Sequence, residues 1–398
     1  MNFAFLLYKY FPYGGLQRDF IRITRECQRR GHQVRVYTLT WEGDLPNDLD
    51  VTVVPVDAMF NHVKYQKFTD WVQNALAVDP VDCVVGFNKM PGLDIYYAAD
   101  SCYEEKARSQ RPWPYRLLPR YHHFSSYEDA VFGVRSSTEI LMISNTQMPY
   151  FLKHYGTRRS RMQLLPPGIS RDRIAPLEAD NLRDHIRESL GIAPNENIIL
   201  FVGSGFIKKG LSRAILAMAS LPDQLRARTR MLVIGEDRAR PFERMIKRLG
   251  LTDHIELLGG RADVPQYLLA GDLLLHPASD ENAGMVLLEA MVAGIPVLAT
   301  DVCGYGHYVV EADMGALVSN PFYQEELDEK LATMLLSGNT RKWRKNGRQF
   351  AETADIYSLP VAAVTAIEKI MKVPELSTTL HVSPKPSPDN SNPNQLSS

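Results

Sequence analysis

The feature that most constrains the fold of this chain is a regular alternation of short apolar runs with helical stretches. An apolar run at residues 2–8 is followed by a glycine-containing loop, a helical stretch at 16–30 and a second apolar run at 33–39. Gly31 ends the helical stretch, because glycine readily adopts the left-handed conformation that closes many helices. The order strand, helix, strand predicts a βαβ unit and therefore a parallel sheet.

The alternation forms two series, separated by a turn-rich segment at residues 164–168 that we interpret as an inter-domain linker. Since 398 residues exceed what one core usually supports, we expect two doubly wound, Rossmann-like α/β domains. They should face a cleft at the carboxyl ends of both sheets, where open α/β sheets bind ligands. The first series has further strands at residues 51–56, 82–87, 95–98 and 139–143 and helices at 68–78 and 147–154; the second has strands at 198–202, 231–234, 255–258, 273–276 and 296–299 and helices at 241–249 and 285–293.

The domain boundaries follow from this pattern. We expect an N-terminal domain over residues 1–165 and a C-terminal domain over 170–356, with a helix at 357–372 that packs back on the first domain. Residues 374–398 are rich in Pro, Ser and Asn, which predicts a disordered tail without a catalytic role.

Composition narrows the class of protein. Apolar residues make up 45% and charged residues 23%, as in soluble globular proteins, and a net charge of −1 provides no global attraction for nucleic acid. No stretch approaches the roughly 20 apolar residues of a membrane span, and the first residues resemble a buried strand more than a signal peptide. The four cysteines are scattered, which indicates a reducing cytoplasm and neither a disulfide framework nor a zinc site.

The most informative segment surrounds Glu281 and Glu289, which are eight positions apart after the predicted strand at 273–276. A helix opens near Gly284, and its N-terminus offers unpaired N–H groups and a partial positive charge that suit a phosphate. A carboxylate can accept hydrogen bonds from two neighbouring sugar hydroxyls. Either glutamate alone could instead be a surface residue stabilised by the helix dipole. Candidate donor-binding residues here are Glu281, Ala283, Gly284, Met285 and Glu289.

A second segment, residues 203–210, follows a predicted strand and carries Lys208 and Lys209 before a glycine. It fits neither a dinucleotide fingerprint nor a P-loop. A strand–loop–helix junction with two lysines remains, and the alternative is a solvated lysine pair. Arg173, just past the linker, and Arg261, in a later strand-end loop, are further candidate cations for a phosphate.

The N-terminal series offers its own candidates. Gly14 and Gly15 lie between the first strand and helix, so that the helix end with Asp19 could approach a ligand across the cleft; the alternative is a tight turn. Asp100 follows the strand at 95–98 and could contact a donor or acceptor hydroxyl, or could be a helix N-cap.

Taken together, these motifs resemble the retaining GT-B glycosyltransferases of family 4. The E-x7-E spacing of Glu281 and Glu289, the glycine pair, the run at residues 30–34 and Lys209 with the glycine after it all match that family. The runs at residues 8–12, 86–94 and 302–308 are most similar to the lipopolysaccharide core enzymes that add the first hexose to inner-core heptose. The resemblance covers about residues 1–370. Departures are Ser204 in place of Arg, Gln17 in place of Glu and Asp100 in place of His.

The resemblance implies transfer of a hexose from UDP-glucose or a UDP-N-acetylhexosamine by front-face attack with retention, without a side-chain nucleophile. Glu281 would hold sugar hydroxyls and Glu289 the ribose, while Lys209, Lys208, Arg173 and Arg261 would stabilise the leaving diphosphate in place of a metal. Asp100 and Asp19 would line the sugar or acceptor side, which makes Asp100, Glu281 and Lys209 the catalytic candidates. We expect no cofactor and no metal, and interpret Asp48-Leu49-Asp50, the one D-x-D match, as a surface turn.

A lipid-anchored acceptor requires contact with a membrane. Residues 103–132 mix cations with interfacial aromatic residues, as suits an anionic surface, and three prolines there prevent one long helix. The alternative is a disordered or core-packed insertion. We expect a cytoplasmic protein, peripheral on the inner face of the bacterial inner membrane. The candidate contacts are Arg111, Trp113, Tyr115, Arg116, Arg120 and Tyr121.

Two other functions fit the pattern less completely. A GT-B epimerase of UDP-N-acetylhexosamine shares the fold and donor but needs no membrane acceptor. A sugar-nucleotide sensor without activity leaves the cations, carboxylates and aromatic–basic segment unexplained together.

Overall fold

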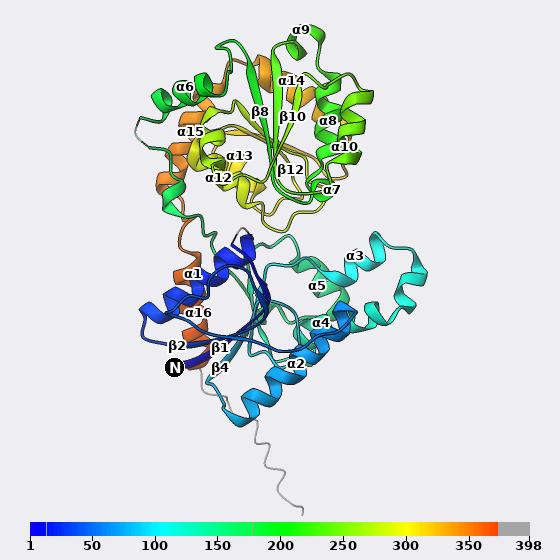
Figure 1. Cartoon of the computed structure of the whole chain (residues 1–398), viewed down its shortest axis with the longest axis vertical. Helices are drawn as coiled ribbons and strands as arrows, with labels where there is room; N and C mark the ends of the chain where they lie inside the picture. The colour runs from blue at the N-terminus through cyan, green and yellow to red at the C-terminus, as the bar shows by residue number, and fades with distance from the viewer. Residues whose placement is uncertain (13, 177, 373–398) are drawn as a thin grey trace, which may run out of the picture.

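The computed structural model describes residues 1–12, 14–176 and 178–372. Two α/β domains lie one above the other, each built around a parallel sheet (Figure 1). The predicted fold class, α/β with two doubly wound domains, is confirmed. The predicted tail at 374–398 lies outside the described residues.

The first sheet has the strand order β3-β2-β1-β4-β5-β6-β7, with all neighbours parallel. Its interior strand β1 is buried from Phe3 to Tyr8, because helices cover both faces of a parallel sheet. The strands are β1 (Asn2–Tyr10), β2 (Gln33–Trp41), β3 (Asp50–Val53), β4 (Cys83–Gly86), β5 (Ile95–Ala98), β6 (Glu139–Met142) and β7 (Met162–Leu164), and the helices are α1 (Gly15–Arg29), α2 (Asn61–Val78), α3 (Tyr103–Ser109), η1 (Trp113–Leu117), α4 (Pro119–Phe132), α5 (Met148–Tyr155) and η2 (Arg159–Arg161).

The second sheet repeats this topology in the order β10-β9-β8-β11-β12-β13. Its strands are β8 (Asn197–Val202), β9 (Thr229–Ile234), β10 (Ile255–Gly259), β11 (Leu273–His276), β12 (Val297–Thr300) and β13 (Gly315–Val318). Its helices are η3 (Arg171–Arg173), α6 (Ala179–Ser189), α7 (Phe206–Lys209), α8 (Leu211–Ser220), α9 (Asp223–Arg226), α10 (Arg240–Arg248), α11 (Val264–Ala270), α12 (Met285–Ala293), α13 (Gly306–Glu311), α14 (Gln324–Leu336) and α15 (Thr340–Thr353).

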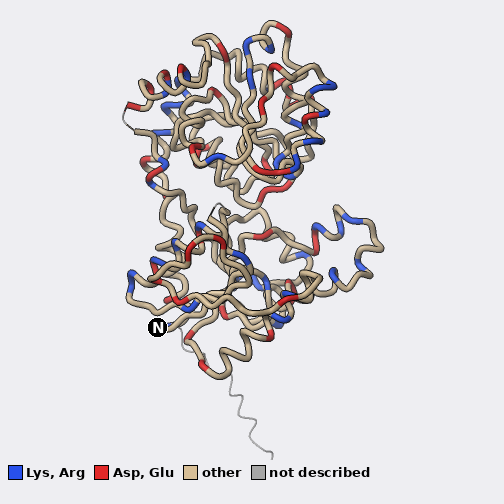
Figure 2. The backbone as a smooth tube through the Cα atoms, in the orientation of Figure 1, with Lys and Arg blue, Asp and Glu red and all other residues tan. Residues whose placement is uncertain are grey.

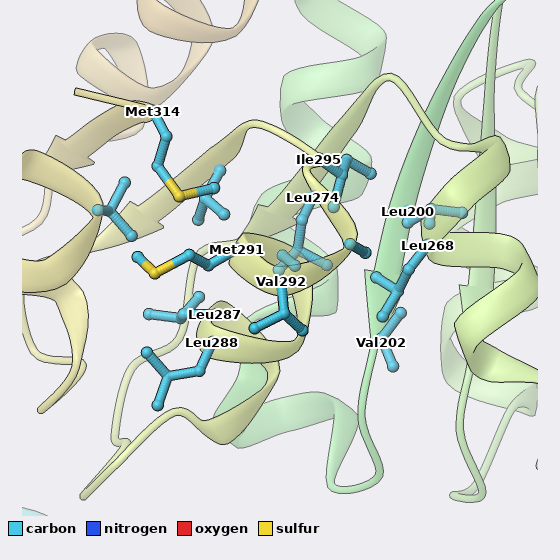
Figure 3. Packing of buried hydrophobic residues seen from close by; sticks show 14 of the residues in the cluster. Leu200, Val202, Leu268, Leu274, Leu287, Leu288, Met291, Val292, Ile295 and Met314 are labelled. Carbon is cyan, nitrogen blue, oxygen red and sulfur yellow. The ribbon is translucent and has the colours of Figure 1, made fainter. Parts of the chain in front are cut away.

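Helix α12 forms the centre of the second domain's core. Leu287, Leu288, Met291 and Val292 are all buried, and Figure 3 shows them beside strand and helix residues of the same cluster. Apart from Glu289, α12 contains only apolar residues, and so apolar a helix is stable only when most of it is buried. This burial fixes the loop before α12, which carries the predicted donor residues.

The structure corrects several parts of the predicted pattern of elements. Residue Leu164, assigned to the linker, is the last residue of β7. The strand predicted at 51–56 ends at Val53. Strand β13 was not predicted, because Gly315 reads as a break; in the structure, any side chain there would collide with the Val297 backbone of the neighbouring strand.

The chain passes between the domains twice, and the two crossings lie side by side. The Ile169 amide donates to the Ile356 carbonyl at 2.8 Å, and the Leu359 amide donates to the Pro167 carbonyl at 3.1 Å. After the second crossing, α16 (Leu359–Lys372) packs against α1 of the first domain.

Candidate active site

The strand order of each sheet reverses at its first strand, and such switch points are where open α/β sheets bind ligands. Loops that follow β5 and β6 in the first domain touch loops that follow β11 and β12 in the second. Asn282 donates from Nδ2 to the Ala99 carbonyl at 2.7 Å. A side chain at Gly304 would collide with the Asn282 carbonyl and Ser144 Oγ, so this approach requires glycine. The inter-domain cleft opens beside these contacts.

Two adjacent cavities, of about 230 and 90 Å³, contain several predicted donor residues. Arg173 and Glu289 line both cavities, while Gly15, Asp19 and Met285 line the larger one. These five of the eleven predicted donor-binding residues come from both domains, so the structure brings part of the predicted donor site together. The other six, Lys208, Lys209, Arg261, Glu281, Ala283 and Gly284, line neither cavity.

Lys209 and Glu281 meet between the end of α7 and the loop after β11. The Lys209 ammonium forms an ion pair with Glu281 Oε2, and His276 Nε2 lies 3.4 Å from the same oxygen. Gly210 makes the approach possible, because it has a φ of 80° and any side chain there would collide with the Pro277 carbonyl. The three side chains therefore form one compact cluster at the carboxyl edge of the second sheet.

The cluster holds a permanent carboxylate. Burial alone raises the pKa of Glu281, but the hydrogen bond with His276 and the charge of Lys209 outweigh it and bring that pKa to about 2. Burial lowers the pKa of the fully buried His276, so the imidazole is neutral near pH 7 and donates from Nε2. Its Nδ1 has no hydrogen-bond partner within the described ranges.

Asp19 and Glu289, two carboxyl groups that line the larger cavity, each have a polar partner from the first domain. Tyr97 donates its hydroxyl to Asp19 Oδ2 at 2.8 Å, and Arg18 of the first domain lies 3.3 Å from Glu289 Oε1 of the second. Burial raises the pKa of Asp19 to about 6, although the hydrogen bond from Tyr97 opposes this rise. The cavity thus combines a carboxyl group that titrates near neutral pH with an ion pair that joins the domains.

Comparison with known proteins identifies the family. Residues 13–173 match the model described as Glycosyltransferase Family 4, and residues 183–350 match Glycosyl transferases group 1. The lipopolysaccharide glucosyltransferase WaaG of Escherichia coli (strain K12) is 48% identical over 368 residues, which cover 92% of this chain and 98% of WaaG. This chain belongs to the WaaG family of glycosyltransferases. The enzyme class predicted from the sequence is thereby confirmed.

Solved structures agree with this assignment. The crystal structure of WaaG, a glycosyltransferase involved in lipopolysaccharide biosynthesis, matches with a TM-score of 0.87 at 48% identity, covering 92% of this chain and 99% of that chain. Anabaena Alr3699/HepE in complex with UDP-glucose matches with a TM-score of 0.72 at 19% identity, covering 93% and 100%, and so shares the fold. The GT-B fold implied by the motifs is confirmed.

Other predicted site residues of this glycosyltransferase lie outside the two cavities. Lys208 is exposed and accepts a hydrogen bond through its carbonyl from the Ser279 amide. Arg261 forms an ion pair with Asp263 at 2.7 Å and stands over the Tyr267 ring. Neither cation lines either of the two cavities.

The remaining predicted residues take defined positions near the cleft. Gly284 is the N-cap of α12, and the Ala283 carbonyl accepts from the Tyr305 amide at 2.8 Å. Asp100 is exposed after β5, and Cys102 rather than Asp100 is the N-cap of α3, so the N-cap alternative for Asp100 is wrong. The exposed carboxylate of Asp100, on the first domain, is therefore free to contact a ligand.

Several contacts in this site were not predicted. His276 reads as part of an apolar strand, and nothing near it in the sequence indicates a partner. Asp280, next to Glu281, accepts from Ser101 Oγ at 3.2 Å and pairs with Lys106 of α3 at 2.6 Å. Spacing cannot reveal the contacts of Asp280, because Ser101 and Lys106 lie far from it in the chain.

The segment predicted to touch a membrane forms a projecting arm, defined here as α3, η1 and α4 (Figure 1). As predicted, the segment does not form one long helix; it is divided into α3, η1 and α4. Trp113 and Leu117 are each 65% exposed, and Figure 2 shows lysine and arginine along the arm. Tyr121 donates to Glu104 at 2.8 Å and Tyr115 pairs with the Tyr103 hydroxyl at 2.9 Å, so these two tyrosines also hold the arm together.

The D-x-D match lies away from the cleft. Asp50 is the first residue of β3, at the amino edge of its sheet, whereas the cleft is at the carboxyl edges. Within residues 1–12, 14–176 and 178–372, no group of three or more His, Cys, Asp or Glu side chains could hold a metal ion. No helix among these residues is long and apolar enough to cross a membrane.

Proposed function

We propose that this glycosyltransferase transfers a hexose, with retention and without a metal, from a UDP-sugar to heptose of the lipopolysaccharide inner core. The observation that carries the proposal is the combination of the Lys209–Glu281–His276 cluster at the carboxyl edge of the second sheet with a two-domain cavity lined by Arg173 and Glu289. The relative that is 48% identical is named a lipopolysaccharide glucosyltransferase, which favours glucose as the hexose and the lipopolysaccharide core as the acceptor.

The reaction releases a nucleoside diphosphate, so negative charge grows on the β-phosphate as the sugar departs. In this structure the Lys209 ammonium is paired with Glu281. We expect a bound diphosphate to draw Lys209 toward itself, while His276 keeps its hydrogen bond to Glu281. Glu281 then accepts hydrogen bonds from the sugar hydroxyls, and the charge of Lys209 stabilises the leaving group.

The other cavity residues suit the nucleoside and the diphosphate. Glu289 can accept the two ribose hydroxyls, and Arg173 lies in the same cavities as a second cation. Asp100 and Asp19 approach from the first domain, on the sugar or acceptor side. Attack on the face from which the diphosphate leaves would give retention and require no side-chain nucleophile.

We further propose that the enzyme works as a peripheral protein on the cytoplasmic face of the inner membrane, held by the projecting arm. Exposed Trp113 and Leu117 can enter the headgroup region of a bilayer, and the arginines of the arm attract anionic lipid. A lipid-anchored acceptor would then lie within reach of the cleft.

The decisive experiment measures turnover of a panel of UDP-sugars with a truncated core acceptor that ends in heptose, in the presence and absence of excess EDTA. We expect transfer from UDP-glucose with retained anomeric configuration and unchanged rates in EDTA. An activity lost in EDTA and restored by Mn²⁺ would refute the metal-independent mechanism. Release of an epimerised sugar without acceptor would instead support the epimerase.

A further inference from the structure

An apolar patch lies outside both the cleft and the arm, at the start of α2. Met59, Phe60 and Val63 are 92%, 59% and 37% exposed, so these side chains add little to the core. Phe60 also occupies the N-cap of α2, where Ser, Thr, Asp or Asn would stabilise the helix. Their presence is therefore not explained by folding.

Positive charge surrounds this patch. Lys64 and Lys67 follow in the first two turns of α2, and both contact Asp57. The Lys64 ammonium lies 3.3 Å from the Asp57 carboxylate, and the Lys67 ammonium donates to the Asp57 carbonyl at 2.9 Å. Of the two ammonium groups, only that of Lys64 pairs with the carboxylate, while that of Lys67 contacts the uncharged carbonyl. The first turn, Asn-His-Val-Lys, leaves the positive end of the helix dipole unneutralised.

The patch adjoins the base of the projecting arm. Helix α2 packs against α4, with the ring of His62 6.1 Å from that of His123 and the ring of Tyr65 6.1 Å from that of Phe124. Figure 1 shows α2 and α4 side by side where the arm leaves the first domain. The apolar patch and the basic arm therefore belong to adjoining surfaces.

We propose that Met59, Phe60 and Val63, together with Lys64 and Lys67, form a second contact with an anionic lipid bilayer. The proposal rests on the membrane attachment proposed above. Apolar side chains enter the headgroup boundary while neighbouring ammonium groups attract anionic lipid, and this combination favours a bilayer over an uncharged protein surface. Contacts at two places, the patch and the arm, restrict rotation of the enzyme on the membrane and so orient its cleft.

The first test compares the double variant Met59→Ser/Phe60→Ser with Val78→Ser, which removes an 87% exposed valine at the other end of α2. The full chain is sedimented with phosphatidylcholine vesicles and with vesicles that also contain phosphatidylglycerol, between 0.1 and 1 M salt. We expect the double variant to partition about tenfold less onto anionic vesicles, equivalent to about 1.4 kcal/mol, with the salt-resistant fraction most affected. Val78→Ser should bind like the parent.

A second measurement reports contact between the patch and lipid directly and does not require a variant that binds vesicles less well. All four cysteines of the chain are buried, so Met59→Cys introduces an accessible thiol for an environment-sensitive fluorophore, and Val78→Cys provides the control. Addition of anionic vesicles should shift the emission of the first probe to the blue and leave the second unchanged. A shift that depends on protein concentration without lipid would assign the patch to self-association and overturn the proposal.

The outcomes separate this inference from the proposed membrane attachment. If the double variant binds vesicles like the parent while Arg111→Ser/Arg116→Ser/Arg120→Ser loses binding, the arm is the contact and the patch is not. If the parent binds neither vesicle, both proposals fail.

Discussion

Replacing Asp19 by Asn is expected to stabilise the first domain at neutral pH while lowering activity. Asp19 is buried, accepts a hydrogen bond from Tyr97 and has its pKa raised by burial from 3.8 to about 6. Because the folded-state value lies above the unfolded one, its stabilising contribution is full below pH 3.8 and is lost as the pH rises through about 6. Above pH 7 the buried carboxylate therefore destabilises the fold.

The size of this effect follows from the two pKa values. Their difference, at about 1.36 kcal/mol per pKa unit, corresponds to a cost of about 3 kcal/mol above pH 7. An asparagine can still accept from the Tyr97 hydroxyl through its amide oxygen but carries no charge. For a domain of this size we expect the melting temperature to rise by about 5–10 °C at pH 7.5 and by much less at pH 4.

The assay is thermal unfolding of parent and variant across this pH range, with Asp44→Asn as the control. Asp44 is an exposed aspartate in the same domain, so its variant should leave the melting temperature unchanged. Since Asp19 lines the larger of the two cavities, where we propose that the donor binds, we also expect kcat/KM of Asp19→Asn to fall at least about tenfold. A variant no more stable than the parent at pH 7.5, or equally stabilised at pH 4, would refute the reasoning.

The other predictions concern the donor cations, the ribose contact and the arm. Lys209→Ala should lower kcat by about 10²–10³, and wild-type kinetics would show that the diphosphate binds elsewhere. Glu289→Ala should mainly raise the KM for the donor, since a ribose contact exists before and during reaction; a selective loss of kcat would contradict that role. Arg111→Ser/Arg116→Ser/Arg120→Ser should weaken binding to anionic vesicles, most at low salt, with turnover of a soluble acceptor nearly unchanged. Equal vesicle binding would argue against the arm as a contact.

Much of the fold could be predicted because a parallel sheet leaves a periodic trace in the sequence. Buried strands such as β1 and β8 are continuous apolar runs, and the helices between them carry one apolar face. The omitted strands β7 and β13 are short and stand beside proline or contain glycine, which are read as turns. The start of α2 was placed too late, since Asn61–Lys67 carries few apolar residues and is held by tertiary contacts.

The candidate site could be predicted only where its residues are close in sequence. Glu281, Gly284 and Glu289 share one loop and one helix, so their spacing in the sequence predicts that they lie near one another. The pairing of Arg18 with Glu289 joins residues 271 positions apart and depends on how the domains meet. His276 could not be assigned as a partner of Glu281, because a histidine within a buried strand has the same sequence context whether or not it bonds to an acid.

The two adjacent chain crossings affect the order in which the protein can be completed during synthesis. The first domain lacks α16 until the whole second domain has been made, although Leu359, Val364 and Ile367 of α16 are part of its core. A nascent chain that ends before residue 359 holds every predicted donor residue but exposes the apolar face of α1. A chimera that takes residues 170–356 from a relative therefore needs two junctions in the sequence. Because Ile169 and Ile356 are hydrogen-bonded to each other, the two junctions lie next to each other in the folded protein.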